Sequence, residues 1–262
     1  MTEPVSPTTP NTWRPDRYVQ HASFVPALAR DLVGWLEPKS GERVLDLGCG
    51  DGVLSMDLVR AGADVVGVDA SGPMTAAARA KGVDARLGAA ESLPFDAEFD
   101  AAFSNAMLHW TRDIDAVLSG VYRALRAGGR FVGEFGGAGN IAIFLAATES
   151  VMSRRGLPFV QPWYFPTPAA FADALTRAGF RVDRTQHFAR PTPLPAGITE
   201  WIGVFGGPLL AHIPAAERSR LAQEIEDVLT PTLRRDDGTW TMDYVRLRFQ
   251  ATKPGAQGNR ES

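Results

Sequence analysis

The chain has 262 residues, which fits one large α/β domain with an added cap better than two independent domains. Its 27 Lys and Arg residues and 30 Asp and Glu residues give a formal net charge of -3 without long runs of one sign, which argues against a nucleic acid partner. The single cysteine, Cys49, excludes an internal disulfide and a multi-cysteine metal site, and no apolar stretch approaches the roughly 20 residues that cross a bilayer. We therefore expect a soluble, cytoplasmic protein.

The two ends of the chain differ in composition from the rest. Residues 1–12 carry Pro, Ser and Thr but no positively charged region followed by an apolar run, so they predict a disordered lead-in and not a secretory signal. Residues 254–262 have the composition of a flexible tail. Residues 13–253 are then expected to form a single domain.

Short apolar stretches alternate with helical patterns along the first half of this domain. Phe24–Leu36 has apolar residues at helical spacing and predicts a helix that leads into the first strand. Ser71 is expected to cap another helix. This alternation predicts βαβ units and a doubly wound, mostly parallel Rossmann-like α/β sheet, whose ligands bind beyond the carboxyl ends of the strands. The strands expected here are Arg43–Leu47, Asp64–Asp69, Val83–Leu87, Phe99–Asn105 and Arg130–Phe135.

The pattern loosens after Phe135. An insertion over residues 191–237 contains an amphipathic helix with Leu221, Ile225 and Leu229 on one face. Two interpretations stay open: the insertion is a helical cap over the ligand edge of the sheet, or it only covers one face of the core. The other elements expected here are helices over Ile141–Met152 and Ala169–Ala178, and strands over Phe180–Phe188 and Trp240–Phe249 that would complete a seven-stranded sheet.

The stretch VLDLGCGDGVLS places three glycines directly after the first strand. Gly48, Gly50 and Gly52 form G-x-G-x-G, whereas the dinucleotide fingerprint needs its third glycine where Val53 stands. Asp51 adds negative charge where the first helical amides would otherwise receive a pyrophosphate. The loop therefore disfavours a phosphate ligand.

A ligand with positive charge reverses that electrostatic argument. Asp46 and Asp51 are then expected to face an ammonium or sulfonium group, directly or through water, while small residues let the backbone come close. Asp69 ends the second strand, where an acidic residue accepts hydrogen bonds from a ribose diol. Nicotinamide and other nucleoside cofactors share that contact, so it does not separate them.

Five motifs stand in an order that is typical of one family. VLDLGCGDG, GVDAS, GAAESLPF, FDAAFSNAMLHW and LRAGGRF together resemble the motifs of class I S-adenosylmethionine-dependent methyltransferases, over residues 43–135. The early segment TWRPDRYVQHASF and the later EWIGVF are similar to a small-molecule subgroup that includes trans-aconitate methyltransferase. The resemblance implies a Rossmann-like fold with S-adenosylmethionine as the cofactor.

The resemblance assigns residues to the methionine and ribose parts of the cofactor. Gly48 and Gly50 would pass close to the methionine part, and Asp69 would hold the ribose hydroxyls. Asn105, at the end of the fourth strand, would border the methionine part and the transfer site. Tyr18 matches an aromatic residue that closes over the amino-acid end of the cofactor in the subgroup.

The adenine part would contact a different set of residues. Ala70 and Met74 would pack near the ring. Where the family often has an acid that binds the adenine amino group, this chain has Ala89. The backbone around Ala90 or the carboxylate of Glu91 is then expected to substitute for that acid.

Methyl transfer from a sulfonium is an in-line displacement that depends on positioning and desolvation, so a catalytic base is optional. His109 follows the fourth strand and is the candidate for a base or an acceptor-orienting group; its alternative role is a cap of the next helix. No acidic or histidine cluster has metal-ligand spacing and no G-x-S-x-G elbow exists, which excludes metal-dependent and acyl-enzyme chemistry. Candidate acceptor-binding residues, of which the aromatic ones could equally be core, are His21, Trp110, Trp163, Trp201 and Phe205.

The sequence thus predicts methyl transfer from S-adenosylmethionine to a small molecule, by O-methylation of a carboxylate or hydroxyl. A carrier- or protein-bound acceptor stays open, as do a nicotinamide-dependent oxidoreductase and a non-catalytic S-adenosylmethionine-binding protein. A nucleic acid methyltransferase is disfavoured because Asn105 precedes Ala-Met-Leu and not Pro-Pro and an aromatic residue. Neither the acceptor's identity nor the oligomeric state follows from the sequence.

Overall fold

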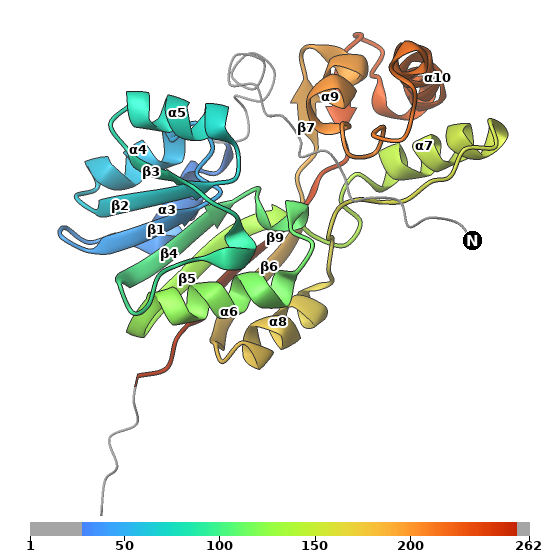
Figure 1. Ribbon diagram of the computed structural model, residues 1–262. Coiled ribbons are helices and arrows are strands. Elements are labelled where there is room, and N and C mark those ends of the chain that lie inside the picture. Colours follow the sequence, from blue (N-terminus) through green and yellow to red (C-terminus); the bar gives the residue numbers. More distant parts are fainter. Residues whose placement is uncertain (1–27, 256–262) are drawn as a thin grey trace, which may run out of the picture. The chain divides into compact units, whose positions relative to one another are not determined.

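A computed structural model describes residues 28–255 of the chain (Figure 1). These residues divide into two compact units. The sheet unit holds residues 28–140, 163–189 and 245–255, and the helical unit holds residues 141–162 and 190–244. The chain therefore passes between the units four times, and the cofactor motifs lie in the sheet unit.

The sheet unit is built on a seven-stranded sheet, as the sequence predicts. The five strands from β3 to β5 pair in parallel, and β9 pairs antiparallel with both β5 and β6. The order switches direction between β1 and β4, which is where ligands of doubly wound sheets bind. In sheet order the strands are β3 (Asp84–Leu87), β2 (Asp64–Asp69), β1 (Arg43–Leu47), β4 (Phe99–Asn105), β5 (Leu125–Gly136), β9 (Val245–Thr252) and β6 (Arg181–Ala189).

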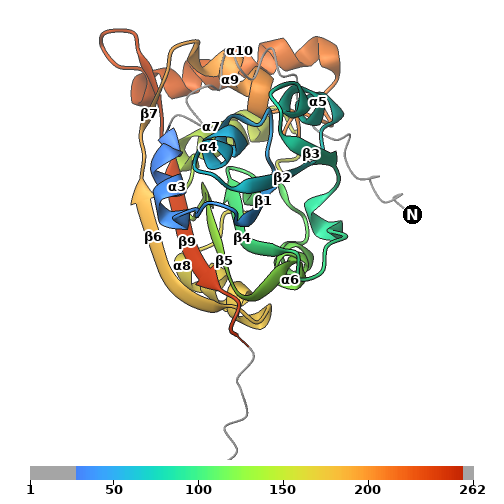
Figure 2. The ribbon, with the colours of Figure 1, turned by 90° about the vertical axis from the view of Figure 1, so that its left-hand side faces the viewer.

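Helices cover both faces of this sheet (Figures 1 and 2). Buried Leu32 and Leu58 pack with Phe103 on one face, and buried Val121 and Phe171 pack with the opposite face. Because apolar strands are covered on both sides, the core is continuous through the sheet. The helices are α3 (Arg30–Leu36), α4 (Val53–Arg60) and α5 (Gly72–Ala80) on the first face, and α6 (Ile114–Ala124) and α8 (Pro168–Arg177) on the second.

Side chains at the helix starts explain where three of these helices begin. The Oγ of Ser71 accepts a hydrogen bond from the backbone N–H of Met74 at 3.4 Å, which confirms the predicted cap of α5. Asp113 caps α6 in the same way, and Thr167 caps α8. Two 3₁₀ turns, η1 (Ala90–Ser92) and η2 (Leu108–Trp110), follow β3 and β4 at the carboxyl edge of the sheet.

Two predicted strands differ from the structure by more than one residue at an end. Trp240–Phe249, predicted as one strand, is two: β8 (Trp240–Met242) pairs with β7 (Thr192–Leu194) in the helical unit, and β9 begins at Val245 in the sheet unit. The prediction was wrong because the chain changes unit between Tyr244 and Val245. β5 starts at Leu125 and not at Arg130, because Leu125 pairs with Phe99 across an irregularity in register.

The helical unit contains more of the chain than the predicted insertion. It comprises α7 (Ala142–Arg154), α9 (Gly197–Phe205), α10 (Ala215–Leu233) and the β7–β8 pair. The predicted apolar face of α10 is buried. The guanidinium of Arg155, which follows α7, donates two hydrogen bonds of 2.8 and 2.9 Å to Glu224 on α10, which ties residues 141–162 to this unit. That the unit covers the ligand edge of the sheet stays a prediction.

Among residues 28–255, no helix is both long and apolar enough to cross a bilayer.

Candidate cofactor and acceptor site

The glycine loop joins β1 to α4 at the carboxyl edge of the sheet. The backbone N–H groups of Gly48 and Cys49 both donate to the carbonyl of Val68 on β2, at 2.7 and 3.1 Å. Gly48 and Gly50 have φ angles of 75° and 55°, in the left-handed region that favours glycine. A Cβ on Gly48 would lie 2.2 Å from the Cγ of Met107, whereas a Cβ on Gly50 would meet no atom within 4 Å. Gly48 is thus needed for packing, and Gly50 leaves space in the loop.

Asp69 connects this loop to the end of β2. One carboxylate oxygen accepts the backbone N–H of Gly50 at 3.0 Å and the other accepts the N–H of Ser71 at 2.8 Å. Burial raises the pKa of this carboxyl above its ordinary value. Two fixed N–H donors orient the carboxylate, and each oxygen keeps a further lone pair that a ribose hydroxyl can use.

Asp46 lies beneath the loop on β1 and is only 2% exposed. Its Oδ2 accepts a hydrogen bond of 2.6 Å from the hydroxyl of Ser55 on α4. Burial, with a further contribution from the negative charge of Asp69, raises the pKa of Asp46 to about 7. Asp46 therefore supports the loop through Ser55.

The expectation that Asp51 faces a positively charged ligand is wrong. The ammonium of Lys81, the residue after α5, lies 2.5 Å from Oδ2 of Asp51 and 2.7 Å from its backbone carbonyl. This ion pair neutralises the carboxylate within the protein. The argument against a phosphate ligand then depends on the glycine spacing at Val53 and no longer on the charge of Asp51.

The residues expected near adenine lie on α5 and η1. Ala70 and Ala89 are exposed, and Met74 is buried at the start of α5. Glu91 uses Oε1 to accept hydrogen bonds from the Thr111 hydroxyl at 2.8 Å and the Arg112 N–H at 3.3 Å. One oxygen of Glu91 thus ties η1 to the segment after η2.

His109 lies on η2, beyond Asn105 at the end of β4, and is 8% exposed. Its Nδ1 accepts a hydrogen bond of 3.3 Å from the backbone N–H of Gly136 at the end of β5. Acceptance at Nδ1 requires the proton of the neutral ring to be on Nε2. Burial, and to a lesser extent the positive charge of Arg246, lower the pKa of His109 to about 3. The ring is therefore neutral at pH 7.

Aromatic side chains surround this histidine within the sheet unit. Trp110 and Phe165 have ring centroids 5.4 and 5.9 Å from that of His109. Trp163 lies 6.0 Å from Phe165 with its ring nearly parallel, and 5.9 Å from Trp110. The N–H of Tyr164 donates to the His109 carbonyl at 3.0 Å, so residues 163–165 dock directly on η2. Trp110 and Trp163 thus lie beside His109 as one aromatic cluster.

Two further predicted acceptor residues belong to the helical unit. Trp201 is on α9 in the helical unit, where it packs against Phe144 and donates from Nε1 to the hydroxyl of Tyr244 at 2.5 Å. Phe205 packs against Trp201. Tyr18 and His21 fall outside the described residues. Within residues 28–255 no group of three or more His, Cys, Asp or Glu side chains could hold a metal ion.

Sequence reasoning missed two residues near His109. Phe165 lies in the aromatic stretch WYFPTP and was not among the predicted candidates. Arg246 is 8% exposed and pairs directly with Gly136 across β5 and β9. The alternation VRLRF places two arginines on one side of β9, a signal that could have marked Arg246.

Comparisons with known proteins agree on one family. Residues 45–133 match the family model of the methyltransferase domain. An uncharacterized methyltransferase of Schizosaccharomyces pombe is 36% identical over 256 residues, which cover 92% of this chain and 98% of that protein. A trans-aconitate 2-methyltransferase of Mycolicibacterium gilvum is 30% identical over 249 residues, or 90% of this chain and 96% of that protein.

A solved structure shows the same fold. The S-adenosylmethionine-dependent methyltransferase of Mesorhizobium loti aligns with a TM-score of 0.53 and 22% identity, over 85% of this chain and 95% of that chain. The residues described here fit that cofactor: Gly50 leaves space in the loop, and Asp69 presents an oriented carboxylate beside it. The family match replaces the nicotinamide-dependent alternative. The chain belongs to the class I S-adenosylmethionine-dependent methyltransferases.

Proposed function

We propose that the protein methylates an oxygen of a small-molecule acceptor, and that this oxygen belongs to a carboxylate in preference to a hydroxyl. The observation that carries the proposal is the hydrogen bond from the Gly136 N–H to Nδ1 of His109. This hydrogen bond requires a neutral imidazole whose proton is on Nε2, so Nε2–H is available as a donor. The imidazole lies among aromatic side chains at the carboxyl edge of the sheet. The bound cofactor supplies an electrophilic methyl group on a sulfonium.

The methionine and ribose parts of the cofactor are held, in this proposal, by the loop after β1 and by the ends of β2 and β4. Asp69 accepts hydrogen bonds from the ribose hydroxyls, and Gly48 and Gly50 let the methionine part approach the backbone. Asn105 borders the transfer site. Asp46 acts from beneath the loop and has no direct contact with the cofactor.

The adenine part of the cofactor is assigned to the residues after β2 and β3. Ala70 and Met74 pack near adenine, and the backbone at Ala89 and Ala90 contacts its edge. The exposure of Ala70 and Ala89 supports this assignment. Glu91 has one oxygen engaged by Thr111, which favours the backbone over its carboxylate as the partner of the adenine amino group.

His109 serves as a hydrogen-bond donor and not as a base. A base needs an available lone pair and a pKa near the working pH, whereas Nδ1 of His109 is engaged and its pKa is about 3. The Nε2–H can orient an acceptor oxygen. A carboxylate is already ionised at neutral pH and needs no base, while a hydroxyl does. The relative named as a trans-aconitate 2-methyltransferase supports the same preference.

The acceptor class can be tested with a methylation assay. Purified protein is incubated with labelled S-adenosylmethionine and, separately, benzoate, fumarate, trans-aconitate, phenol and a primary alcohol, and products are resolved by mass spectrometry. Base-sensitive methyl esters of one or more acids are expected. Methyl ethers without esters would contradict the carboxylate preference, and failure to bind S-adenosylhomocysteine in calorimetry would contradict the cofactor site.

Two variants of His109 test its role. His109→Phe removes the donor and is expected to lower kcat about ten- to one-hundredfold while sparing cofactor affinity, because one oriented hydrogen bond is lost. His109→Gln keeps a donor amide and is expected to retain more activity. Equal kcat for wild type and His109→Phe would reduce His109 to a structural role.

We also propose that the protein works in the cytoplasm on a free small molecule, as one domain with an inserted cap. The acidic charge balance and the single cysteine support this setting. Cell fractionation and size-exclusion chromatography of the active protein would test the location and supply the oligomeric state.

A further inference from the structure

We propose that Arg246 binds a carboxylate of the acceptor, together with the Nε2–H of His109, and thereby determines that the enzyme prefers anionic acceptors. This inference rests on the proposed function and adds the residue that would select the substrate class. Arg246 lies more than one hundred residues after the last cofactor motif in the sequence.

The topology brings Arg246 to the ligand edge of the sheet. β9 runs antiparallel to β5, so the start of β9 lies beside the end of β5. Arg246 is the second residue of β9 and pairs with Gly136, the last residue of β5. Directly opposed residues of an antiparallel pair have Cα atoms about 4.5–5.5 Å apart, and their side chains point to the same face.

Gly136 links Arg246 to His109. The N–H of Gly136 donates to Nδ1 of His109, so the backbone of one residue both orients the imidazole and opposes the arginine. A Cβ on Gly136 would lie 2.5 Å from the ring of Phe165 and 2.7 Å from the Asn140 amide, which shows that these groups lie on the side of Gly136 that Arg246 shares. The guanidinium charge also contributes to the neutral state of His109.

The loop after β5 holds this region in place. The N–H of Gly137 donates to the carbonyl of Val245 at 3.1 Å, and the N–H of Val245 donates to Oδ1 of Asn140 at 2.9 Å. Ala138 donates to the carbonyl of Pro166, next to Phe165. Arg246 and the aromatic cluster therefore belong to one hydrogen-bonded frame, and a subsite built on it is preorganised.

Arg248, on the same strand, is an arginine with a structural role. It lies two residues further on the same side of β9 and donates to Glu134, the residue opposite it on β5, at 2.6 and 2.8 Å, and to Asp31 on α3 at 2.9 and 3.0 Å. The residue opposite Arg246 is a glycine and supplies no carboxylate across the strand pair. Arg246 has protein contacts of its own, and the five donors of a guanidinium allow it to keep such contacts while it binds a carboxylate.

The guanidinium of Arg246 and the Nε2–H of His109 are hydrogen-bond donors that suit a carboxylate. A guanidinium binds a carboxylate with two parallel hydrogen bonds, and the neutral imidazole adds one N–H. The aromatic cluster suits the carbon skeleton of the acid. A neutral alcohol cannot form the charge-assisted pair of hydrogen bonds that a carboxylate forms with the guanidinium, and a protonated amine would be repelled by its charge, so anionic acceptors are selected.

The test compares Arg246→Gln and Arg246→Lys with wild type, using the acids that the wild-type enzyme methylates. Arg246→Gln is expected to raise KM for a carboxylate acceptor about ten- to one-hundredfold, because hydrogen bonds to a charged group are lost, and to leave S-adenosylhomocysteine affinity within about twofold. Arg246→Lys keeps the charge without the paired donors and should give an intermediate KM. Arg184→Gln is the matched control, since Arg184 is exposed on β6 and stacks on Trp35; its KM should equal that of wild type.

The outcomes separate this inference from the proposed function. An Arg246→Gln protein that binds S-adenosylhomocysteine and keeps the wild-type KM for acids overturns the assignment. If Arg246→Gln does not fold, an unchanged KM in Arg246→Lys overturns it, and a raised KM supports it. Wild-type methylation of neutral acceptors alone, with normal cofactor binding, overturns the anionic preference while methyl transfer itself stands; absent cofactor binding in the wild type refutes the proposed function first.

Discussion

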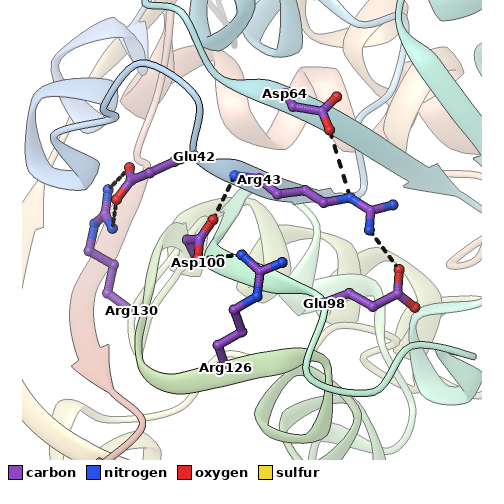
Figure 3. Close-up of polar contacts among 7 residues, drawn as sticks. All are labelled: Glu42, Arg43, Asp64, Glu98, Asp100, Arg126 and Arg130. Atoms are coloured by element: carbon purple, nitrogen blue, oxygen red, sulfur yellow. Dashed lines mark hydrogen bonds and ion pairs between the residues drawn. The ribbon is translucent and has the colours of Figure 1, made fainter.

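The two edges of the sheet differ in how their carboxylates are held: ion pairs hold those of the amino edge, whereas at the carboxyl edge Asp51 is paired with Lys81 but Asp69 and Asp46 are held by uncharged donors. At the amino edge, Figure 3 shows arginine and carboxylate side chains paired with one another: Arg130 binds both oxygens of Glu42 at 2.9 and 2.7 Å, and Asp100 accepts from Arg126 and from the N–H of Arg43. At the carboxyl edge, Asp69 accepts two backbone N–H groups and Asp46 accepts a serine hydroxyl.

This difference indicates that charged residues of the amino edge serve stability and those of the carboxyl edge serve function. Each ion pair between partly exposed groups contributes little to the free energy of unfolding, and together these pairs connect neighbouring strand ends. Asp69, which is oriented by neutral donors, keeps lone pairs for a ligand, and burial raises the pKa values of Asp69 and Asp46, which is typical of functional sites. Substitutions at the amino edge should therefore change the free energy of unfolding, and substitutions at the carboxyl edge should change binding and turnover.

The largest expected effect is at Gly48. Gly48→Ala places a Cβ 2.2 Å from Met107 at a left-handed φ, which should lower the free energy of unfolding by about 3 kcal/mol through overpacking and backbone strain. Gly50→Ala has strain without a clash and should cost about 1 kcal/mol, yet weaken cofactor binding. Denaturant unfolding and calorimetry measure both quantities. The Cβ of Met107 lies 2.4 Å from the added Cβ as well, so the double variant Gly48→Ala with Met107→Gly, which removes both side-chain atoms, should recover part of the stability; no recovery would show that the clash is not the cause.

The next largest effect is expected for Asp69→Ala. The loss of charge-assisted hydrogen bonds to ribose and of the anchor on Gly50 should weaken S-adenosylhomocysteine binding about one hundredfold in calorimetry. Asp100→Ala, an aspartate of the amino edge, is the control and should lower stability without changing that affinity. Equal losses of affinity in both variants would contradict the division between the edges.

The pH dependence of stability should show a smaller, partly cancelled effect. Asp46 has its pKa raised to about 7, so its contribution to stability is present at low pH and is lost as the pH rises from about 4 through 7. His109 has its pKa lowered to about 3, so its contribution is present above about 6.5 and is lost as the pH falls toward 3. Asp46→Asn should thus make stability rise more steeply between pH 4 and 7 than in wild type, measured by urea unfolding at several pH values. An unchanged profile would argue against a buried, protonated Asp46.

The smallest expected effect is at the amino edge. Arg130→Met removes the paired hydrogen bonds to Glu42, whose pKa the Arg130 guanidinium lowers, and should cost about 1 kcal/mol or less because both groups are partly exposed. The difference from wild type should shrink in high salt, and cofactor affinity should not change. A loss of affinity would mean that the amino edge also shapes the cofactor site.

Local sequence determined most of the sheet and the position of the cofactor loop. Arg43–Leu47, Asp64–Asp69 and Phe99–Asn105 were predicted with their observed bounds, because each is a run of apolar and β-branched residues that ends at a turn. The same runs place Asp69 and Asn105 at strand ends, since parallel strands deliver their last residues to one edge. Family motifs then identified the cofactor.

Tertiary structure decided what the charged side chains do. Asp51 meets Lys81 thirty residues away, and Gly136 joins His109 to Arg246, which stands 137 positions further along the chain than His109, a pairing that no local period encodes. The split of Trp240–Phe249 into β8 and β9 likewise depends on which unit each half pairs with. Backbone periodicity is a local property of the chain and can be read from it, whereas the partner of a carboxylate, an imidazole or an edge strand is chosen by packing between distant segments.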